Sequence, residues 1–441
     1  MGVDFRVNSY NESKLIKDEE NGMTKNKKLL VIGGASQHCK VVETAHELGI
    51  KVYVADYLET APAKEIADVS KLIDINDIDG LVELCKEEQI DGAIATSLDA
   101  CQIPYQKLCE RMGFPCFGSK EQFHILTNKN AFKEFCQMHS VDVIPTYSAN
   151  DIEEDSMVEY PVFVKPVDSR GSRGQSICKN KAEVFAALKY AKQFASDGDV
   201  VIEKYMGDCQ DFTVSYLCNN GTISVVRTGD RFEGTRGSGL ENLCIASYSP
   251  SKFTEQYLKT VNTVVVDMIK DLGIKNGPVF FQGFIDNGKV RFYDPGLRFA
   301  GGEYERILKQ ITGIDIIKSL VEFAMSGKID TVIDNNELCY LNGNKIIQLD
   351  PTLSPGTVMQ IDGLDEIRHI PDVLYVSQRV FVGDTISKTN DLRQRFGEIC
   401  ILCENESRLI EVVLKIQSLL KILDENGESM IYEPFNIKRL L

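Results

Sequence analysis

Apolar and polar residues along the first quarter of the chain follow repeated strand and helix patterns. The apolar run at residues 29–32 predicts a buried strand, which ends at a Gly-Gly pair and is followed by a helical pattern as far as residue 48. Further elements are expected after it: strands at 51–56 and 92–96, and helices at 81–88 and 106–112. Because strands that alternate with helices form parallel sheets, we expect a parallel α/β domain here.

The pattern changes from residue 121 onward, where strands and helices no longer alternate regularly. The elements predicted up to residue 328 are a helix at 121–138, two strands around a loop at 160–166 and 174–178, a helix at 181–194, strands at 200–205, 212–218 and 223–227, a helix at 254–273, a hairpin of 279–285 and 290–293, and a helix at 314–325. Residues beyond 328 are rich in strand patterns. The expected fold class is therefore α/β followed by α+β, with a strand-rich C-terminal lobe.

The composition is that of a globular protein and argues against two classes of partner. The chain has 441 residues, of which 43% are apolar and 26% charged, which is enough for about three domains. A formal net charge of −16 argues against a nucleic acid partner, and the shortness of the apolar runs excludes a membrane span. Scattered cysteines and the lack of a leader pattern predict free thiols in a cytoplasmic protein, with residues 1–27 as a disordered extension.

The first turn allows two interpretations. Gly33 and Gly34 follow the first strand and Asp56 ends the second, as in folds that bind nicotinamide cofactors. The full G-x-G-x-x-G pattern is absent, because no third glycine follows. A tight turn whose amides face a small anion, or no ligand at all, is the favoured interpretation, and a nicotinamide oxidoreductase stays open as an alternative.

The strongest chemical signal lies between residues 161 and 174. A buried strand places Lys165 at its end, and a loop of small residues with Arg170 and Arg173 follows. Small residues let backbone amides close over an anion, while lysine supplies a point charge and arginine supplies forked donors. The lysine precedes the glycines and a strand follows them, so this is not the strand–GxxxxGK[ST]–helix phosphate loop.

This combination, followed by the strand and segment at 201–205, resembles the ATP-grasp superfamily over about residues 28–328. The resemblance implies that Lys129 and Lys165 contact the nucleotide phosphates and that Asp211 holds the ribose hydroxyls. The other nucleotide-binding residues that it implies are Ser169, Gly171, Ser172 and Gly174 in the loop, and Glu203, Lys204 and Tyr205 in the segment that pairs with adenine. It also implies a division into a preceding domain at 28–120, linker helices and a small subdomain at 121–206, a large subdomain at 207–328 and a C-terminal lobe at 329–441.

The implied metal site agrees with the superfamily in part. The superfamily usually has an acidic residue on one strand and a Glu-x-Asn-x-Arg cluster at the end of the next. Here Gln282 holds the first position, as in the carbamoyl phosphate synthetase branch, and Asp294 replaces the Glu, so these two are the expected metal ligands. Gly296 stands where Asn is expected, which leaves a second metal open. Arg298 is retained, and Arg298 and Lys165 are the two expected catalytic residues.

The resemblance implies an ADP-forming carboxylate–amine ligase that works through an acyl phosphate, on an amino acid or a similar small carboxylate. ATP and Mg²⁺, or Mn²⁺ in its place, are the expected cofactors. Joining a carboxylate to an amine in water is uphill, so the carboxylate must first become an acyl donor, and that needs no His or Cys nucleophile. The expected substrate contacts are Arg231, Arg236, Gly301 and Gly302.

Other functions stay open beside the ligase. One is a bicarbonate-using carboxylase or a carbamoyl-phosphate-type enzyme, and another is a nucleotide-binding protein that has lost catalysis, motivated by Gly296. The nicotinamide oxidoreductase is the third. The partners expected for the ligase are small carboxylate and amine substrates, with no nucleic acid and no membrane, and a homodimer is one possible assembly.

Overall fold

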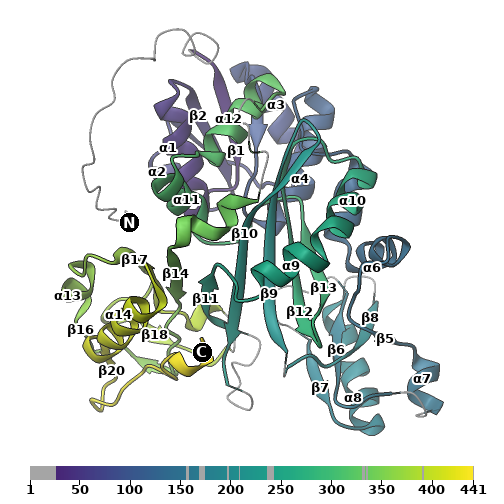
Figure 1. The fold of residues 1–441 in the computed structure, drawn as a ribbon. Coiled ribbons are helices and arrows are strands. Elements are labelled where there is room, and N and C mark those ends of the chain that lie inside the picture. Colours follow the sequence, from purple (N-terminus) through teal and green to yellow (C-terminus); the bar gives the residue numbers. More distant parts are fainter. Residues whose placement is uncertain are drawn as a thin grey trace.

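The computed structural model describes residues 26–154, 158–167, 174–195, 198–207, 209–235, 243–329, 333, 336–389 and 392–440. Figure 1 shows an α/β domain near the N-terminus in purple, a long central sheet in teal, a small sheet beside it and a C-terminal lobe in yellow. Residues 1–25, most of the expected extension, lie outside the described residues. The domain boundaries themselves stay predictions.

A parallel sheet in the order β3-β2-β1-β4 forms the first domain. Its strands are β1 (Lys28–Ile32), β2 (Lys51–Asp56), β3 (Val69–Leu72) and β4 (Gly92–Ile94), and the helices between and after them are α1 (Cys39–Glu47), α2 (Pro62–Glu65), α3 (Ile78–Glu88) and α4 (Asp99–Met112). Residues 29–32 of β1 are fully buried, as expected of a central parallel strand. The expected parallel domain is confirmed; β3 was missed because none of its residues is fully buried and its sequence is half polar.

The Gly-Gly turn after β1 is held by the acid that ends β2. The amide of Gly34 donates to Asp56 Oδ2 at 2.7 Å, and the amide of Leu58 donates to Asp56 Oδ1 at 2.8 Å. Gly33 has a φ of +91°, which L side chains rarely adopt, so glycine is required there. Since the carboxylate already accepts the Gly34 amide, the turn has a structural explanation and needs no dinucleotide.

An eight-stranded antiparallel sheet forms the centre of the molecule, in the order β13-β12-β9-β10-β11-β14-β19-β17. The strands are β9 (Gln210–Asn219), β10 (Thr222–Glu233), β11 (Cys244–Ser249), β12 (Gly277–Asp286), β13 (Lys289–Gly296), β14 (Lys345–Leu349), β17 (Val373–Gln378) and β19 (Gly397–Cys403). The predicted boundary at 328 and 329 therefore falls inside this sheet, between β11 and β14. Strands of the C-terminal lobe extend the sheet of the preceding region.

A second, smaller sheet has the order β5-β8-β6-β7 and faces one end of the central sheet (Figure 1). Its strands are β5 (Thr146–Tyr147), β6 (Val162–Pro166), β7 (Ser176–Cys178) and β8 (Val200–Lys204), and α8 (Lys181–Ala191) packs on it. The single helix expected before it is two helices, α5 (Lys120–Thr127) and α6 (Lys129–Met138). They separate at Asn128, whose extended backbone and side-chain oxygen cap the N-terminus of α6.

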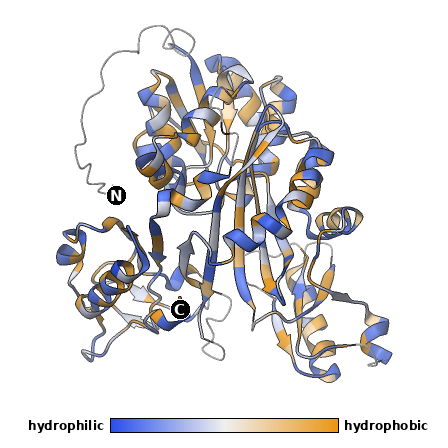
Figure 2. Ribbon diagram, viewed as in Figure 1, coloured by the Kyte–Doolittle hydropathy of each residue, from blue (hydrophilic) through white to orange (hydrophobic). Residues whose placement is uncertain are grey.

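The C-terminal lobe has its own core and one long helix, α14 (Glu406–Leu419). The sequence analysis missed α14, although Leu409, Val412, Val413 and Ile416 recur at helical spacing and are buried. Figure 2 shows hydrophobic residues along the strands of the central sheet, whereas α9 (Thr254–Thr260), which lies over it, is mainly hydrophilic. Among the described residues, no helix is both long and apolar enough to cross a membrane.

The segment after β13 joins the central sheet to the first domain. Helices α11 (Tyr304–Thr312) and α12 (Ile316–Ser326) lie beside the purple elements in Figure 1, and α12 packs on α1 and β4. A buried ion pair closes this junction, with Lys40 Nζ 2.5 Å from Glu305 Oε2 and 3.0 Å from the Gly302 carbonyl oxygen. Both side chains are almost completely inaccessible to water. If the partner of either charge were removed, water could not solvate that charge in its place.

We predict that Lys40→Met destabilises the chain strongly, because it leaves the Glu305 carboxylate buried and unpaired, which costs about 3–5 kcal/mol. The double variant Lys40→Met, Glu305→Leu should recover much of that loss, since it removes both charges. Urea unfolding midpoints of the three proteins measure this. Equal destabilisation of the single and double variants would contradict it.

Candidate active site

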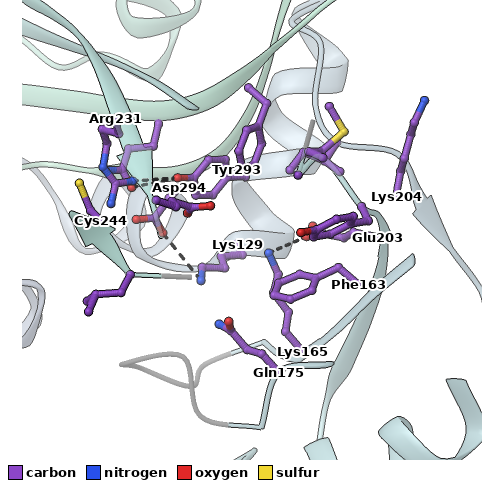
Figure 3. A pocket seen from close by; sticks show the side chains of 18 of the residues that line it. Lys129, Phe163, Lys165, Gln175, Glu203, Lys204, Arg231, Cys244, Tyr293 and Asp294 are labelled. Atoms are coloured by element: carbon purple, nitrogen blue, oxygen red, sulfur yellow. Dashed lines mark hydrogen bonds and ion pairs between the residues drawn. The ribbon is translucent and has the colours of Figure 1, made fainter. Parts of the chain in front are cut away.

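A cavity of about 360 Å³ lies between the small sheet and the central sheet. Figure 3 shows charged side chains converging on it from both sides. Its lining includes eight of the predicted or implied positions and several others. The predicted ones are Lys129, Lys165, Glu203, Lys204, Tyr205, Arg231, Gln282 and Asp294, with Asp211 bound to Arg231 at the edge; the others include Ile144, Phe163, Gln175, Met206, Cys244, Phe284 and Tyr293.

Two lysines share one buried carboxylate on the small-sheet side. Lys165 Nζ, at the end of β6, lies 2.5 Å from Glu203 Oε2, and Lys133 of α6 pairs with the other oxygen of Glu203. Burial alone would raise the pKa of Glu203, but the two ammonium groups lower it to about 2, so the carboxylate stays ionised. Three charges with a net charge of +1 are thereby held at the cavity wall.

A cation and two oxygen ligands meet on the central-sheet side. Lys129 Nζ, at the first residue of α6, lies 3.8 Å from Asp294 Oδ1. Asp294 of β13 and Gln282 of β12 are directly opposite in the strand register, so both side chains project from the same face of the sheet. A carboxylate and an amide oxygen side by side are ligands that Mg²⁺ accepts, with water and phosphate oxygens completing its shell. No group of three or more metal-binding side chains occurs in the part of the chain that the structure describes.

Arg231 is held at the other end of the cavity by an acid and a phenol. Its Nη1 lies 2.8 Å from Asp211 Oδ2 and 3.1 Å from Tyr293 Oη. The Tyr293 hydroxyl lies within 3.4 Å of both Asp211 oxygens and of Gln282 Oε1. Because Arg231 is already paired, it fixes Asp211 in place instead of presenting an unpaired charge.

The segment after β8 forms the rim of the cavity. The amides of Lys204 and Tyr205 donate to the carbonyl oxygens of Pro145 and Pro161, at 2.9 and 3.1 Å. The Lys204 ammonium pairs with Glu159 at 2.8 Å and points away from the other lining side chains in Figure 3. What this segment offers the cavity is therefore backbone carbonyls and the next amide, that of Met206.

Two family models match the chain. The D-ala D-ala ligase C-terminus model matches residues 131–235, which include the small sheet, β9 and β10. The PylC-like N-terminal domain model matches residues 29–103, which include the parallel sheet. Together the two matches reach both halves of the region on which the sequence resemblance was based.

Curated relatives are similar over most of this region. A formate-dependent phosphoribosylglycinamide formyltransferase of Wolinella succinogenes is 22% identical over 271 residues, which is 60% of this chain and 68% of that one. The 2-oxoglutarate carboxylase small subunit of Hydrogenobacter thermophilus is 25% identical over 327 residues, 69% of this chain and 67% of that one.

Solved structures share the fold over about nine tenths of this chain. An L-amino acid ligase from Bacillus licheniformis superposes with a TM-score of 0.74 at 19% identity, over 91% of this chain and 100% of that one. The biotin carboxylase domain of the Hydrogenobacter thermophilus 2-oxoglutarate carboxylase, in complex with MgADP, ADP and bicarbonate, gives 0.72 at 19% identity, over 90% and 91%. The fold of this chain is that of the ATP-grasp superfamily. The expected resemblance and fold class are thus confirmed.

The expected catalytic Arg298 does not line this ATP-grasp cavity. Its Nε lies 2.6 Å from Asp99 Oδ1, at the start of α4, and its Nη1 donates to the Phe299 carbonyl oxygen at 2.6 Å. Its guanidinium stacks on the ring of Phe280, 4.3 Å from the centroid. Arg298 therefore sits at the junction with the first domain, and its catalytic role stays a prediction.

Gly296, the departure from the superfamily pattern, has a steric explanation. Gly296 of β13 is directly opposite Phe280 of β12. A side chain at 296 would overlap the Phe280 ring. The space of the missing asparagine is thus filled by the aromatic ring on which Arg298 stacks.

The remaining predicted residues are elsewhere. Gly301 and Gly302 line a separate small cavity beside Arg227. Gly174, two residues before β7, adopts a φ of +73° and lies next to Pro166 and Phe194. The loop positions Ser169, Gly171 and Ser172, together with Arg236, lie outside the described residues.

Sequence reasoning missed several residues in and around the cavity. Lys133 was hidden inside a helix pattern, and only its spacing of four from Lys129 marks it as a neighbour on the same helix face. Phe163 lies two residues before Lys165 on β6, so the side chains of both project from the same side of the strand. Tyr293 precedes Asp294 at a register irregularity between β12 and β13, which no sequence pattern signals.

We predict that Glu203→Gln destabilises the protein at neutral pH by about 3–5 kcal/mol, because two buried ammonium groups lose their counterion. The folded-state pKa of Glu203 is about 2, below the ordinary value of 4.5, so its stabilisation is complete above about pH 4.5 and is lost as the pH falls toward 2. The gap in urea midpoint between wild type and variant should therefore shrink from about pH 7 to about pH 3.

Glu159→Gln is the matched control, since Glu159 pairs with Lys204 at the exposed rim. A gap that stays constant across this pH range, or one equally large in the control, would contradict the buried role of Glu203.

Proposed function

We propose that this chain is an ADP-forming, ATP-dependent carboxylate–amine ligase that works through an acyl phosphate on an amino acid or a similar small carboxylate, with ATP and Mg²⁺ as cofactors. The observation that carries the proposal is the meeting of Lys129, Lys165, Gln282 and Asp294 in one cavity between two sheets. Cations for phosphates and oxygens for a divalent ion face one another there. The likeness to ligases and carboxylases supports the same general chemistry.

The cavity suits a nucleotide in a defined direction. The rim segment, with Phe163 and Met206 beside it, offers apolar surface and backbone groups to a base. Asp211 lies at the edge next to Arg231, where its carboxylate oxygens can accept hydrogen bonds from the ribose hydroxyls. Lys129 and Lys165 approach the middle of the cavity, where they would hold the phosphates as point charges.

Gln282 and Asp294 would hold magnesium, which supplies charge neutralisation for the transferring phosphoryl group. With two protein ligands, most of the coordination shell is left to phosphate oxygens and water. Lys129 lies 3.8 Å from Asp294, so it would balance the carboxylate before the nucleotide enters. The residues therefore fit a metal that arrives with ATP.

The reaction needs two displacements. A substrate carboxylate oxygen bonds to the γ-phosphorus while the bond to the β-phosphate oxygen breaks, and ADP leaves. The amine nitrogen then bonds to the carbonyl carbon, the bond from that carbon to the phosphate oxygen breaks, and the nitrogen loses a proton. In this proposal Lys165 neutralises the phosphates, and Arg298, aligned by Asp99 and Phe280, stabilises the oxyanion of the tetrahedral intermediate.

A carboxylase that activates bicarbonate is the second candidate, favoured by the similarity to the 2-oxoglutarate carboxylase small subunit. In both candidate reactions ATP phosphorylates an acid, which is bicarbonate for the carboxylase and an amino acid or similar carboxylate for the ligase. Bicarbonate-dependent ADP formation without an amino acid would favour the carboxylase, and amino-acid-dependent ADP formation would favour the ligase. The proposal also includes a small carboxylate and an amine as substrates, and a homodimer as the assembly.

We predict that Lys165→Ala lowers ATP turnover by about 100-fold or more, because a preorganised charge at the transferring phosphate contributes several kcal/mol. Steady-state ADP release in the presence of a mixture of amino acids measures this. Lys189→Ala, exposed on α8, is the control and should keep its rate. Near-normal turnover of Lys165→Ala would remove this lysine from the site.

We predict that magnesium binds tightly only when a nucleotide is present, since two protein ligands make a poor cage. Calorimetric titration of Mg²⁺ with and without a non-hydrolysable ATP analogue tests this. Asp294→Asn should weaken the nucleotide-dependent binding. Tight binding to the protein alone, or binding unaffected by Asp294→Asn, would contradict the assignment.

A further inference from the structure

One face of the central sheet is polar well beyond the nucleotide cavity. The side chains of Arg227 and Arg231 project from the same side of β10, because residues an even number of positions apart share a face. Thr228 and Asp230 between them face the opposite side, where they bind Thr254 and Ser251. At about 3.3 Å per residue, Arg227 lies about 13 Å along the strand from Arg231.

Arg227 is buried without a counterion. Its residue is 8% exposed, and within the described residues no carboxylate lies within ion-pair distance of it. Its polar contact is a long one, from Nη1 to the Gly301 carbonyl oxygen at 3.4 Å, and its guanidinium lies over the Tyr304 ring at 4.5 Å from the centroid. Its Nε has no hydrogen-bond partner among the described residues. A buried guanidinium with an unused donor is costly unless a ligand supplies an anion.

A second polar group with no partner lies next to it. Ser215 of β9 is directly opposite Arg227 in the register, so both side chains project from the same face. The Ser215 hydroxyl is buried and, among the described residues, has no hydrogen-bond partner. Arg227 and Ser215 are thus neighbours on one face of the sheet.

A small cavity opens beside Arg227, and its lining includes Arg227, Ser247, Ser249 and the Gly301-Gly302 pair. Gly302 has a φ of +96°, and a Cβ there would lie 3.0 Å from Gln348 Oε1. Since the two glycines carry no side chains, backbone comes close to the cavity. One carboxylate, that of Glu303, also lines it, but its Oε2 lies 3.0 Å from Arg306 Nε.

The cavity is near the residue expected to handle the reacting carbonyl. Phe280, on which Arg298 stacks, is directly opposite Ser215 in the register of β12 and β9. With strands about 4.8 Å apart, Arg227 is about 10 Å from Phe280 across two strands. The segment that follows Arg298 also leads directly to Gly301 and Gly302. Arg227 therefore lies two strands away from the residue that supports Arg298.

We propose that Arg227, beside the Gly301-Gly302 backbone, binds the free carboxylate of an amino acid substrate, the carboxylate that is not phosphorylated. This rests on the proposed ligase function and names its substrate class. Guanidinium and carboxylate match as forked donors and paired acceptors, and the buried setting strengthens the pairing. The carboxylate would also supply the counterion that Arg227 lacks in the described structure.

The test is binding, read without turnover. The full chain with MgADP is mixed with each common L-amino acid, and affinity is taken from the concentration dependence of the thermal unfolding midpoint. At least one amino acid should stabilise the wild type, and its C-terminal amide, which has no negative charge, should not. Arg227→Gln should weaken that binding by about 10- to 100-fold, as expected for loss of a charged hydrogen bond.

Arg227→Lys keeps the charge and should bind better than Arg227→Gln, which shows that loss of binding is not loss of folding. Arg368→Gln, on the partly exposed helix α13 (Leu364–Arg368), is the control. No stabilisation by any amino acid, equal binding of acid and amide, or unchanged affinity of Arg227→Gln would each overturn the inference.

ADP formation measured on the same samples separates this inference from the ligase proposal. Amino acid binding through Arg227 without ADP formation would leave the inference standing and remove the ligase. Amino-acid-dependent ADP formation with an unchanged Michaelis constant in Arg227→Gln would leave the ligase and remove the inference.

Discussion

The cavity depends on a single buried carboxylate that holds two ammonium groups. Lys133 and Lys165 come from a helix and a strand on the same side of the molecule, and both pair with Glu203. Without that carboxylate, two like charges close together in a poorly hydrated wall would repel each other and lose their hydration. With it, the wall keeps one net positive charge in a fixed position. The small sheet can therefore present a charge to a phosphate without rearranging its core.

The central sheet contributes in a different way, through register. Antiparallel pairing places side chains of neighbouring strands in rows across one face, and here those rows bring polar side chains of several strands together. One row brings Asp294 and Gln282 together, and another brings Phe280, Ser215 and Arg227 together. A shift of one residue in any strand would turn its members to the opposite face. Which side chains meet on this face therefore depends on the register of the strands as much as on the identity of the residues.

Sequence reasoning reached the architecture because strand and helix periods are local. It identified the parallel domain, the hairpin of β12 and β13, and Lys165 at the end of β6, since each depends on a few adjacent residues. The expected nucleotide contacts Lys129 and Asp211 and the expected metal ligand Asp294 came from the resemblance to the ATP-grasp superfamily.

What sequence reasoning missed depends on contacts far apart in the chain. Arg298 turns toward Asp99, almost two hundred positions earlier, and nothing near it in the sequence announces that partner. The break between α5 and α6 is a capping effect of Asn128 that competes with a continuous apolar stripe. Arg227 lies in a polar stretch whose arginines look alike in sequence, and it differs from Arg231 in its burial and in the ion pair that Arg231 makes with Asp211.

The contact between Phe280 and Gly296 makes two positions interdependent. The ring occupies the volume that a side chain at 296 would need, and it is also the surface on which Arg298 stacks. An asparagine at 296 is therefore compatible only with a smaller residue at 280, and a smaller residue at 280 removes the support of the arginine. The effects of substitutions at these two positions will not add, because each changes the meaning of the other. A lineage that began with either residue could reach the other arrangement only by way of an intermediate with an overfilled or a hollow site.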